Sequence, residues 1–123
     1  MTAQPKRILF VDDRPEYMHQ PVLRLRMEGY QVDEAESEEA AITALREHGY
    51  DLLVFDADLP GGDGWQVLKR MRQDEEVGDA KVIVLMAASG ETANLHLVEV
   101  DAELRRPFTM AQLLVTVREV LES

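Results

Sequence analysis

Cysteine is absent from this sequence of 123 residues, which excludes disulfide bonds, cysteine-ligated zinc sites and thiol nucleophiles. Long hydrophobic runs are also missing, because the longest one, residues 82–88, is far shorter than the roughly 20 residues that a transmembrane helix needs. Only four apolar residues separate Arg7 from two aspartates, which argues against a secretory signal peptide. We therefore expect a cytoplasmic protein that does not associate with a membrane.

Basic residues are in the minority, since 13 Lys and Arg stand against 24 Asp and Glu and the formal net charge is −11. A negative surface repels the phosphate backbone of nucleic acids, and the basic residues are scattered along the chain, so direct nucleic-acid binding is not expected. The length and the hydrophobic content of 46% are typical of one globular domain, which we place at residues 1–123.

Short apolar runs alternate with amphipathic stretches along the chain, and this alternation predicts an α/β protein with a doubly wound parallel sheet. The predicted strands are residues 8–11, 31–35, 52–55, 82–86 and 101–104. Ser37 is expected to cap the helix that follows it, and Thr109 with Gln112 is expected to form a capping box for the last helix. Pro21 should kink the first helix or delay its start, and residues 89–100 form the least regular helical segment.

Carboxylates follow two of the predicted strands, at the ends where an open α/β sheet places its ligand crevice. Asp12 and Asp13 follow the first strand, where they could also simply cap the next helix. Asp56 follows the third strand and begins a segment that includes Asp58. If these strands are neighbours, several like charges share one crevice and favour a bound cation. Oxygen ligands without Cys or His indicate Mg²⁺ or Mn²⁺.

The spacing of these acidic residues, together with a motif after the fifth strand, resembles the receiver domain of bacterial two-component response regulators. The resemblance extends over the whole chain and rests on the following residues: Asp12, Asp13, Asp56, Pro60, Asp63, Gly64, Arg106, Pro107 and Phe108. It implies a (βα)₅ flavodoxin-like three-layer sandwich with a five-stranded parallel sheet. It also implies a signalling protein rather than an enzyme.

The resemblance further implies that Asp56 accepts a phosphoryl group from a sensor histidine kinase or a phosphotransfer protein. Mg²⁺ would be held by Asp12, Asp13, Asp56 and the backbone carbonyl of Asp58. Phosphoryl transfer requires positioning and charge neutralisation more than covalent help, which suits a carboxylate nucleophile beside a divalent cation. Phosphorylation would then reshape a surface for an output partner that the sequence does not identify.

Several positions depart from the family pattern. Arg106 stands where the family has a lysine, and its guanidinium is planar and longer, so it could contact the phosphoryl group or act as a fixed counter-ion of the acidic pocket. Met86, followed by Ala87, stands where the family has a Ser or Thr, and a thioether cannot donate the expected hydrogen bond. Ser89 is a remote substitute for it. Glu103 replaces the usual aromatic residue, so we expect weakened or altered conformational switching.

Two alternatives remain open at this point. In the first, the chain is a phosphorylation-independent pseudo-receiver that acts as a protein–protein interaction module, with Arg106 holding the acidic pocket shut. In the second, a remote one, Asp56 and Asp58 resemble the nucleophile and general acid of haloacid-dehalogenase-type phosphohydrolases. That family supplies its metal carboxylates after the nucleophile strand, whereas Asp12 and Asp13 precede it here.

Overall fold

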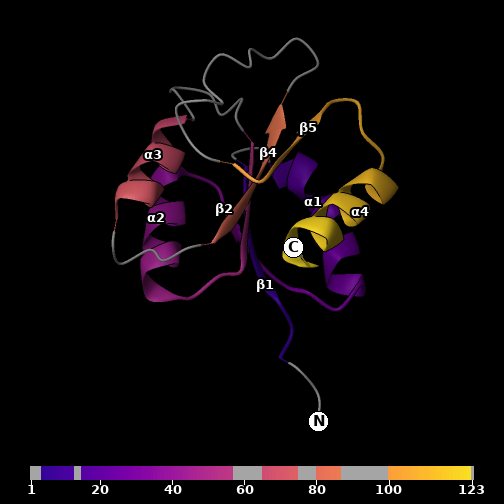
Figure 1. Ribbon diagram of the computed structural model, residues 1–123, viewed down its shortest axis with the longest axis horizontal. Helices are drawn as coiled ribbons and strands as arrows, with labels where there is room; N and C mark the ends of the chain where they lie inside the picture. Colours follow the sequence, from indigo (N-terminus) through magenta and orange to yellow (C-terminus); the bar gives the residue numbers. More distant parts are fainter. Residues whose placement is uncertain (1–3, 13–14, 57–64, 75–79, 87–99, 123) are drawn as a thin grey trace.

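The computed structural model describes residues 4–12, 15–56, 65–74, 80–86 and 100–122. These residues form five strands and four helices, labelled as in Figure 1. In chain order they are β1 (Arg7–Val11), α1 (Pro15–Met27), β2 (Gln31–Ala35), α2 (Glu38–Glu47), β3 (Leu52–Asp56), α3 (Trp65–Gln73), β4 (Lys81–Met86), β5 (Ala102–Arg105) and α4 (Met110–Glu122). None of the helices described is both long and apolar enough to cross a bilayer.

The strands form one parallel sheet with the order β2-β1-β3-β4-β5, in which β2 and β5 are the edges. The predicted strands all agree with the observed ones to within one residue at each end. This order belongs to the flavodoxin-like class of doubly wound folds, so the predicted fold class is confirmed. Because the strands are parallel, their carboxyl ends all lie on the same side of the sheet, which is the upper side in Figure 1.

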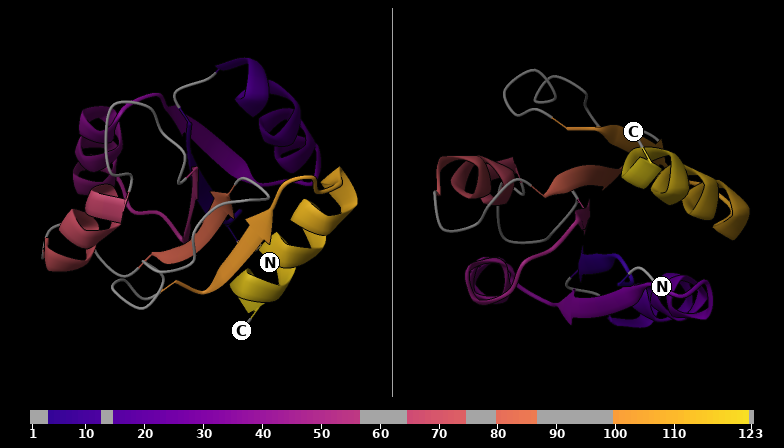
Figure 2. Two further views of the ribbon diagram at one scale, coloured as in Figure 1. Left: turned by 90° about the horizontal axis from the view of Figure 1, so that it is seen from above. Right: turned by 60° about the horizontal axis from the view of Figure 1, so that its bottom comes forward.

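Helices cover both faces of the sheet and make a three-layer molecule, with α1 and α4 on one face and α2 and α3 on the other (Figures 1 and 2). The strands β1, β3 and β4 are almost entirely buried, and alternate side chains feed two separate hydrophobic cores. Leu9, Val11 and Phe55 pack with the α2 and α3 face. Ile8 and Phe10 pack with the α1 and α4 face.

The first helix differs from the sequence-based expectation. It begins at Pro15, a residue whose fixed φ suits the first helical position, and continues through Pro21 to Met27. Of the two effects expected of Pro21, a kink or a late start, the late start is therefore wrong. Met18, Val22 and Leu25 are all buried on one face of this helix. Burying each such side chain contributes about 1.5–3 kcal/mol, and together they outweigh the roughly 3 kcal/mol that an interior proline costs.

Candidate functional site

Asp12 and Asp56 lie side by side at the carboxyl ends of two neighbouring strands. Val11 pairs with Phe55 in the β1–β3 register, so the next positions in the two strands are Asp12 and Asp56. Their exposed fractions are 1% and 0%, and they are the buried charged residues in the described part of the chain. Adjacent strands are about 4.8 Å apart, so the backbone places these two acids side by side at the carboxyl edge of the sheet.

Arg106 brings a positive charge to this crevice from the segment after β5. Its backbone N–H donates to the carbonyl oxygen of Met86 at 2.9 Å, which continues the β4–β5 pairing by one residue and fixes the start of its side chain. Its Nη2 then donates to Oδ2 of Asp56 at 2.8 Å. Because the Asp56 carboxylate is fully buried and the Arg106 side chain is 31% exposed, this ion pair spans the boundary between the interior and the solvent.

The residues at the predicted switch positions are only partly described. Met86 is the last residue of β4, 2% exposed, and packs in the core on the α2 and α3 face. Glu103 lies on the edge strand β5, and its side chain is exposed, 4.0 Å from Nε of Arg105. The predicted ligands Asp13 and Asp58 and the positions Ala87 and Ser89 lie outside the described residues, as does the helical segment expected at residues 89–100.

Sequence reasoning missed a pocket of about 390 Å³ beside the acids, on the α1 and α4 face of the sheet. Its walls come from α1, β1, β4 and the segment that leads into α4, and they are mostly apolar. Asp12 and Arg106 both line it, so it opens directly onto the candidate site. Pro21, which the sequence marked only as a helix-breaking residue, is one of its wall residues. No sequence pattern indicates that segments so distant in the chain line one pocket.

The donor set at the site suits a hard divalent cation. Two buried carboxylates, those of Asp12 and Asp56, stand at adjacent strand ends, and Arg106 supplies one positive charge against them. Mg²⁺ is commonly held by one or two protein carboxylates while it keeps several waters. Among the described residues no group of three or more acidic or His side chains is close enough to hold a metal, and the other two predicted ligands lie outside that part of the chain.

Comparison with protein-family models matches residues 8–118 to the response regulator receiver domain. The chain belongs to this family. A receiver domain is the signalling module of a two-component response regulator, and that function is therefore the function of this domain. The family resemblance deduced from the acidic motifs is confirmed, and the comparisons do not favour either alternative function.

Characterised relatives support the same conclusion. The phosphate regulon transcriptional regulatory protein PhoB of Pseudomonas aeruginosa is 31% identical over 118 residues, which cover 94% of this chain and 52% of PhoB. This receiver thus spans about half the length of that relative. A CheY-like receiver domain protein from Methanospirillum hungatei matches with a TM-score of 0.86 at 25% identity, over 96% of this chain and 94% of that one.

The relative that bears most directly on the site is the response regulator TrrA of Thermotoga maritima. Its structure was solved in complex with Mg²⁺-BeF, and it is 33% identical with a TM-score of 0.81, over 94% of this chain and 98% of that one. Receiver domains bind Mg²⁺ in their active site. The names of the relatives also describe transcriptional regulators, so the expectation that this protein has no direct contact with nucleic acid stays untested.

Proposed function

We propose that Asp56 is the phosphoryl acceptor of this receiver. The observation that carries the proposal is the placement of Asp56: a fully buried carboxylate at the carboxyl end of the central strand, next to Asp12 and 2.8 Å from the guanidinium of Arg106. A carboxylate with acidic and basic neighbours is positioned for in-line attack on phosphorus, because phosphoryl transfer depends on alignment and neutralisation of charge.

In the proposed reaction, a carboxylate oxygen of Asp56 forms a bond to phosphorus while the bond from phosphorus to the nitrogen of a donor histidine breaks. The donor imidazole keeps the electron pair of that bond and takes up a proton. Asp12, Asp13 and Asp56, with the backbone carbonyl of Asp58, would hold Mg²⁺ or Mn²⁺, which neutralises charge on the phosphoryl oxygens when it is bound. Arg106 would exchange its contact with Asp56 for a phosphoryl oxygen.

The ion pair between Arg106 and Asp56 is also the observation that favours the second candidate function. A guanidinium that stays on Asp56 would occupy one carboxylate oxygen and leave a pseudo-receiver that binds partners without phosphorylation. We favour the phosphorylated form because a phosphoryl group on Asp56 would offer Arg106 a charge-assisted hydrogen bond in place of the one that it gives up.

We further propose that the response of the domain to phosphorylation is weakened or altered. The positions that would carry the response are Met86, Ala87, Ser89 and Glu103. A hydrogen bond to a charged group contributes about 1.5–3 kcal/mol, and the thioether of Met86 cannot donate one to a phosphoryl oxygen. The salt contact between Glu103 and Arg105 indicates that the outer surface of β5 is polar in this receiver.

The partners follow from the same proposal. A sensor histidine kinase or a phosphotransfer protein would supply the phosphoryl group, and an output protein or a further domain would read the result. A cytoplasmic location is proposed because kinases draw their phosphoryl groups from cytoplasmic ATP. We propose that residues 1–123 act as one receiver domain, supported by the match over residues 8–118.

Intact-mass analysis after incubation with Mg²⁺ and a small phosphodonor, acetyl phosphate, tests the proposal. We expect one phosphoryl adduct on the wild type, none on Asp56→Asn, and an unchanged yield on the control Asp33→Asn, which removes a carboxylate from the edge strand β2. An adduct that persists on Asp56→Asn would place the acceptor elsewhere. An unmodified wild type together with a modified Arg106→Lys variant would establish the pseudo-receiver, with the Arg106–Asp56 ion pair as its cause.

A further inference from the structure

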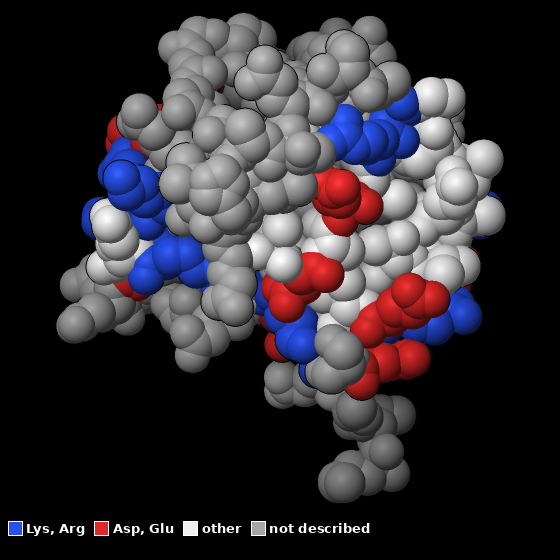
Figure 3. Space-filling model, turned by 45° about the horizontal axis from the view of Figure 1, so that its top comes forward, with Lys and Arg blue, Asp and Glu red and all other residues white. Residues whose placement is uncertain are grey.

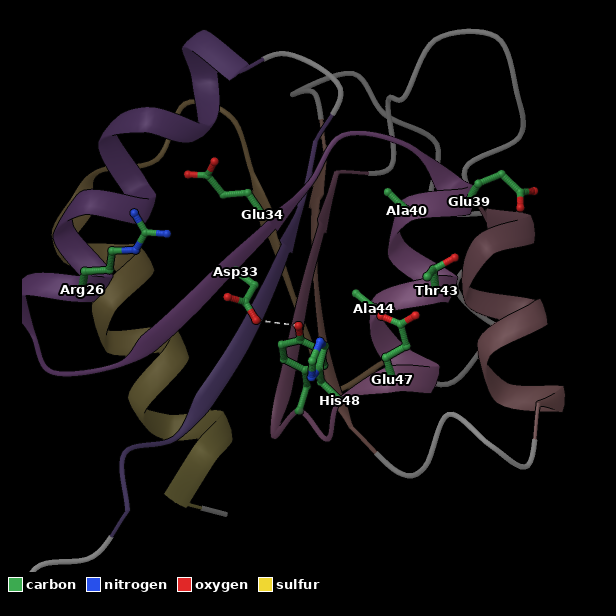
Figure 4. A pocket seen from close by; sticks show the side chains of 10 residues that line it. Arg26, Asp33, Glu34, Glu39, Ala40, Thr43, Ala44, Glu47 and His48 are labelled. Atoms are coloured by element: carbon green, nitrogen blue, oxygen red, sulfur yellow. Dashed lines mark hydrogen bonds between the residues drawn. The ribbon is translucent and has the colours of Figure 1, made fainter.

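A groove of about 690 Å³ lies along the β2 edge of the sheet, and none of Asp12, Asp56 and Arg106 lines it. Figure 4 shows this groove between α1 and α2, with the edge strand β2 as its floor. The wall formed by α2 includes three small side chains, those of Ala40, Thr43 and Ala44, which leave room between Glu39 and Glu47 for a polypeptide backbone to approach the strand.

The backbone of β2 presents hydrogen-bonding groups to this groove. The N–H of Gln31 donates to the carbonyl oxygen of Lys6 at 3.0 Å, and the carbonyl oxygen of Ala35 accepts from the N–H of Asp12 at 3.1 Å. Every second residue of β2, counted from Gln31, therefore bonds toward β1. In a parallel strand the intervening residues, Val32 and Glu34, then direct their N–H and C=O groups away from the sheet. Such an edge is a template for a further strand.

Carboxylates line the groove on both sides of the edge. Glu34 faces the α1 side, and Asp33, Glu39 and Glu47 face the α2 side (Figure 4). In the described part of the chain neither Glu34 nor Glu47 forms an ion pair. The face shown in Figure 3 differs, because acidic and basic side chains are interspersed over its coloured surface.

Asp33 is held in position within the groove. The hydroxyl of Tyr50 donates to Oδ2 of Asp33 at 2.6 Å. Burial, reinforced by this hydrogen bond, raises the pKa of Tyr50 well above its ordinary value, so the phenol stays protonated at neutral pH and keeps donating. The carboxylate therefore has a fixed orientation at the centre of the edge strand.

Arg26 gives the α1 side of the groove a different character. Its Nη2 donates to the outward carbonyl oxygen of Val32 at 2.8 Å, so an added strand would bond to the other outward groups of β2 or displace Arg26 from this oxygen. The guanidinium lines the α1 side of the groove together with Glu34. The α1 side thus sets one guanidinium against one carboxylate. The α2 side carries the three carboxylates of Asp33, Glu39 and Glu47. Asp33 lies 3.4 Å from Nη2 of Arg7, and Glu39 lies 3.6 Å from Nη1 of Arg70, which Glu38 shares, so this side keeps a net negative charge. A strand that enters the groove meets negative charge on one of its two faces.

We propose that the β2 edge docks an extended segment of another protein that carries Lys or Arg at alternate positions. Alternate side chains of a strand point to the same face, so every second residue of the segment would meet the carboxylates on the α2 side. Glu39 and Glu47 are about 12 Å apart along their helix, which matches the roughly 13 Å between side chains i and i+4 of a strand. A second copy of this chain is disfavoured as occupant because each copy carries a net charge of −11.

Fluorescence anisotropy with synthetic peptides tests the proposal. The probe is a labelled peptide Gly-Lys-Thr-Lys-Thr-Lys-Gly, and two controls are a peptide of the same composition with its lysines adjacent and a copy of the probe with methylated backbone nitrogens. We expect saturable binding of the probe at low ionic strength and about tenfold weaker binding of each control, since strand addition requires both alternation and backbone hydrogen bonds. Equal binding of all three peptides, or no binding of the probe, would overturn the proposal.

Variants locate the binding on the molecule. Glu39→Gln with Glu47→Gln should weaken binding of the probe about fivefold, as expected for the loss of two exposed ion pairs, whereas the charge-matched control Glu119→Gln with Glu122→Gln on α4 should change it less than about twofold. If the two double variants weakened binding equally, the effect would depend only on the net charge of the molecule, and the proposal would be wrong.

A further pair of variants separates backbone pairing from charge. Glu34→Pro removes an N–H that points out of the sheet, and Glu34→Thr removes the same carboxylate but keeps that N–H. We expect Glu34→Pro to bind the probe more weakly than Glu34→Thr, and equal affinities of two folded variants would contradict strand addition. Because neither the probe nor these variants involve Asp56, the outcome does not depend on phosphorylation.

Discussion

At the scale of single residues, Met86 best shows how one side chain adapts this receiver. The register pairs Asp56 with Leu85, so Met86 stands one residue beyond the partner of the proposed phosphoryl acceptor. Its side chain is 2% exposed and contributes to the core on the α2 and α3 face. A side chain that serves the core in this way stabilises the fold but provides no hydroxyl for a phosphoryl group to attract.

Replacement of Met86 by threonine is expected to lower the stability of the fold and to strengthen the coupling between phosphorylation and the conformational change. Met86→Thr and the control Met86→Ala should both lower the free energy of unfolding by roughly 2 kcal/mol or more, because each leaves a cavity in the core. Only Met86→Thr supplies a donor, and a hydrogen bond of about 1.5–3 kcal/mol should shift the equilibrium toward the switched state about tenfold or more. Urea unfolding measures the first effect.

Amide shifts of β5 in ¹H–¹⁵N spectra, recorded before and after phosphorylation, measure the second effect. Larger phosphorylation-dependent shifts in Met86→Thr than in Met86→Ala are the expected result. Identical shifts in the two variants would show that the missing hydroxyl is not what limits the response of this domain.

The site residues could be predicted from the sequence to different extents. Asp12 and Asp56 could be predicted as neighbours because each follows an apolar run, and parallel strands bring such ends to one side of a sheet. The contact of Arg106 with Asp56 could be predicted only as one of two roles, since the sequence also allowed Arg106 to contact the phosphoryl group. The pocket next to the site could not be predicted, because its walls come from four separate segments that meet only through tertiary packing.

At the scale of elements, α4 shows how a local motif positions the site. Oγ1 of Thr109 accepts from the N–H of Gln112 at 3.0 Å, and Oε1 of Gln112 accepts from the N–H of Thr109 at 2.8 Å, so the predicted capping box is confirmed. The motif lies three residues after Arg106 and fixes where the helix begins. It therefore restrains the short segment that carries Arg106 to Asp56.

Loss of this capping box is expected to destabilise the domain measurably. Thr109→Ala should lower the free energy of unfolding by about 1 kcal/mol, because an orphan N–H of the first turn loses its acceptor. Gln112→Ala should have a smaller effect of the same sign, and Gln112→Glu should retain the stability of the wild type because it preserves the reciprocal bond. Urea unfolding of these variants checks the order, and a full loss in Gln112→Glu would contradict it.

The elements themselves could be predicted well from the sequence where burial dictates the pattern. The central strands β1, β3 and β4 were found to within one residue because buried parallel strands appear as continuous apolar runs with polar ends. Of the two effects expected of Pro21, a kink or a late start, the late start was wrong because a local rule about proline ignored the burial of Met18, Val22 and Leu25 on the same helix. Local propensity fails where tertiary packing contributes more free energy than the local cost.

At the scale of the whole molecule, the net charge of −11 is distributed unevenly. Two carboxylates are buried at the strand ends, and others gather along the β2 edge. Self-repulsion of this kind destabilises the folded state, and any salt relieves it in part by screening. A divalent cation held specifically at Asp12 and Asp56 would stabilise the molecule beyond that general effect.

Thermal unfolding in MgCl₂ and in NaCl of equal ionic strength separates the two effects. We expect Mg²⁺ to raise the Tm of the wild type above its value in NaCl, by a stabilisation of about 1.4 kcal/mol when Mg²⁺ is present at ten times its Kd. The difference between the two salts should vanish in Asp12→Asn and persist in Glu119→Gln, which removes one charge from the exposed surface of α4. Since each variant is compared only with itself in the two salts, a change in its intrinsic stability does not affect the result. A difference that survives in Asp12→Asn would mean that Mg²⁺ acts elsewhere on this acidic surface, and the proposed metal site would be wrong.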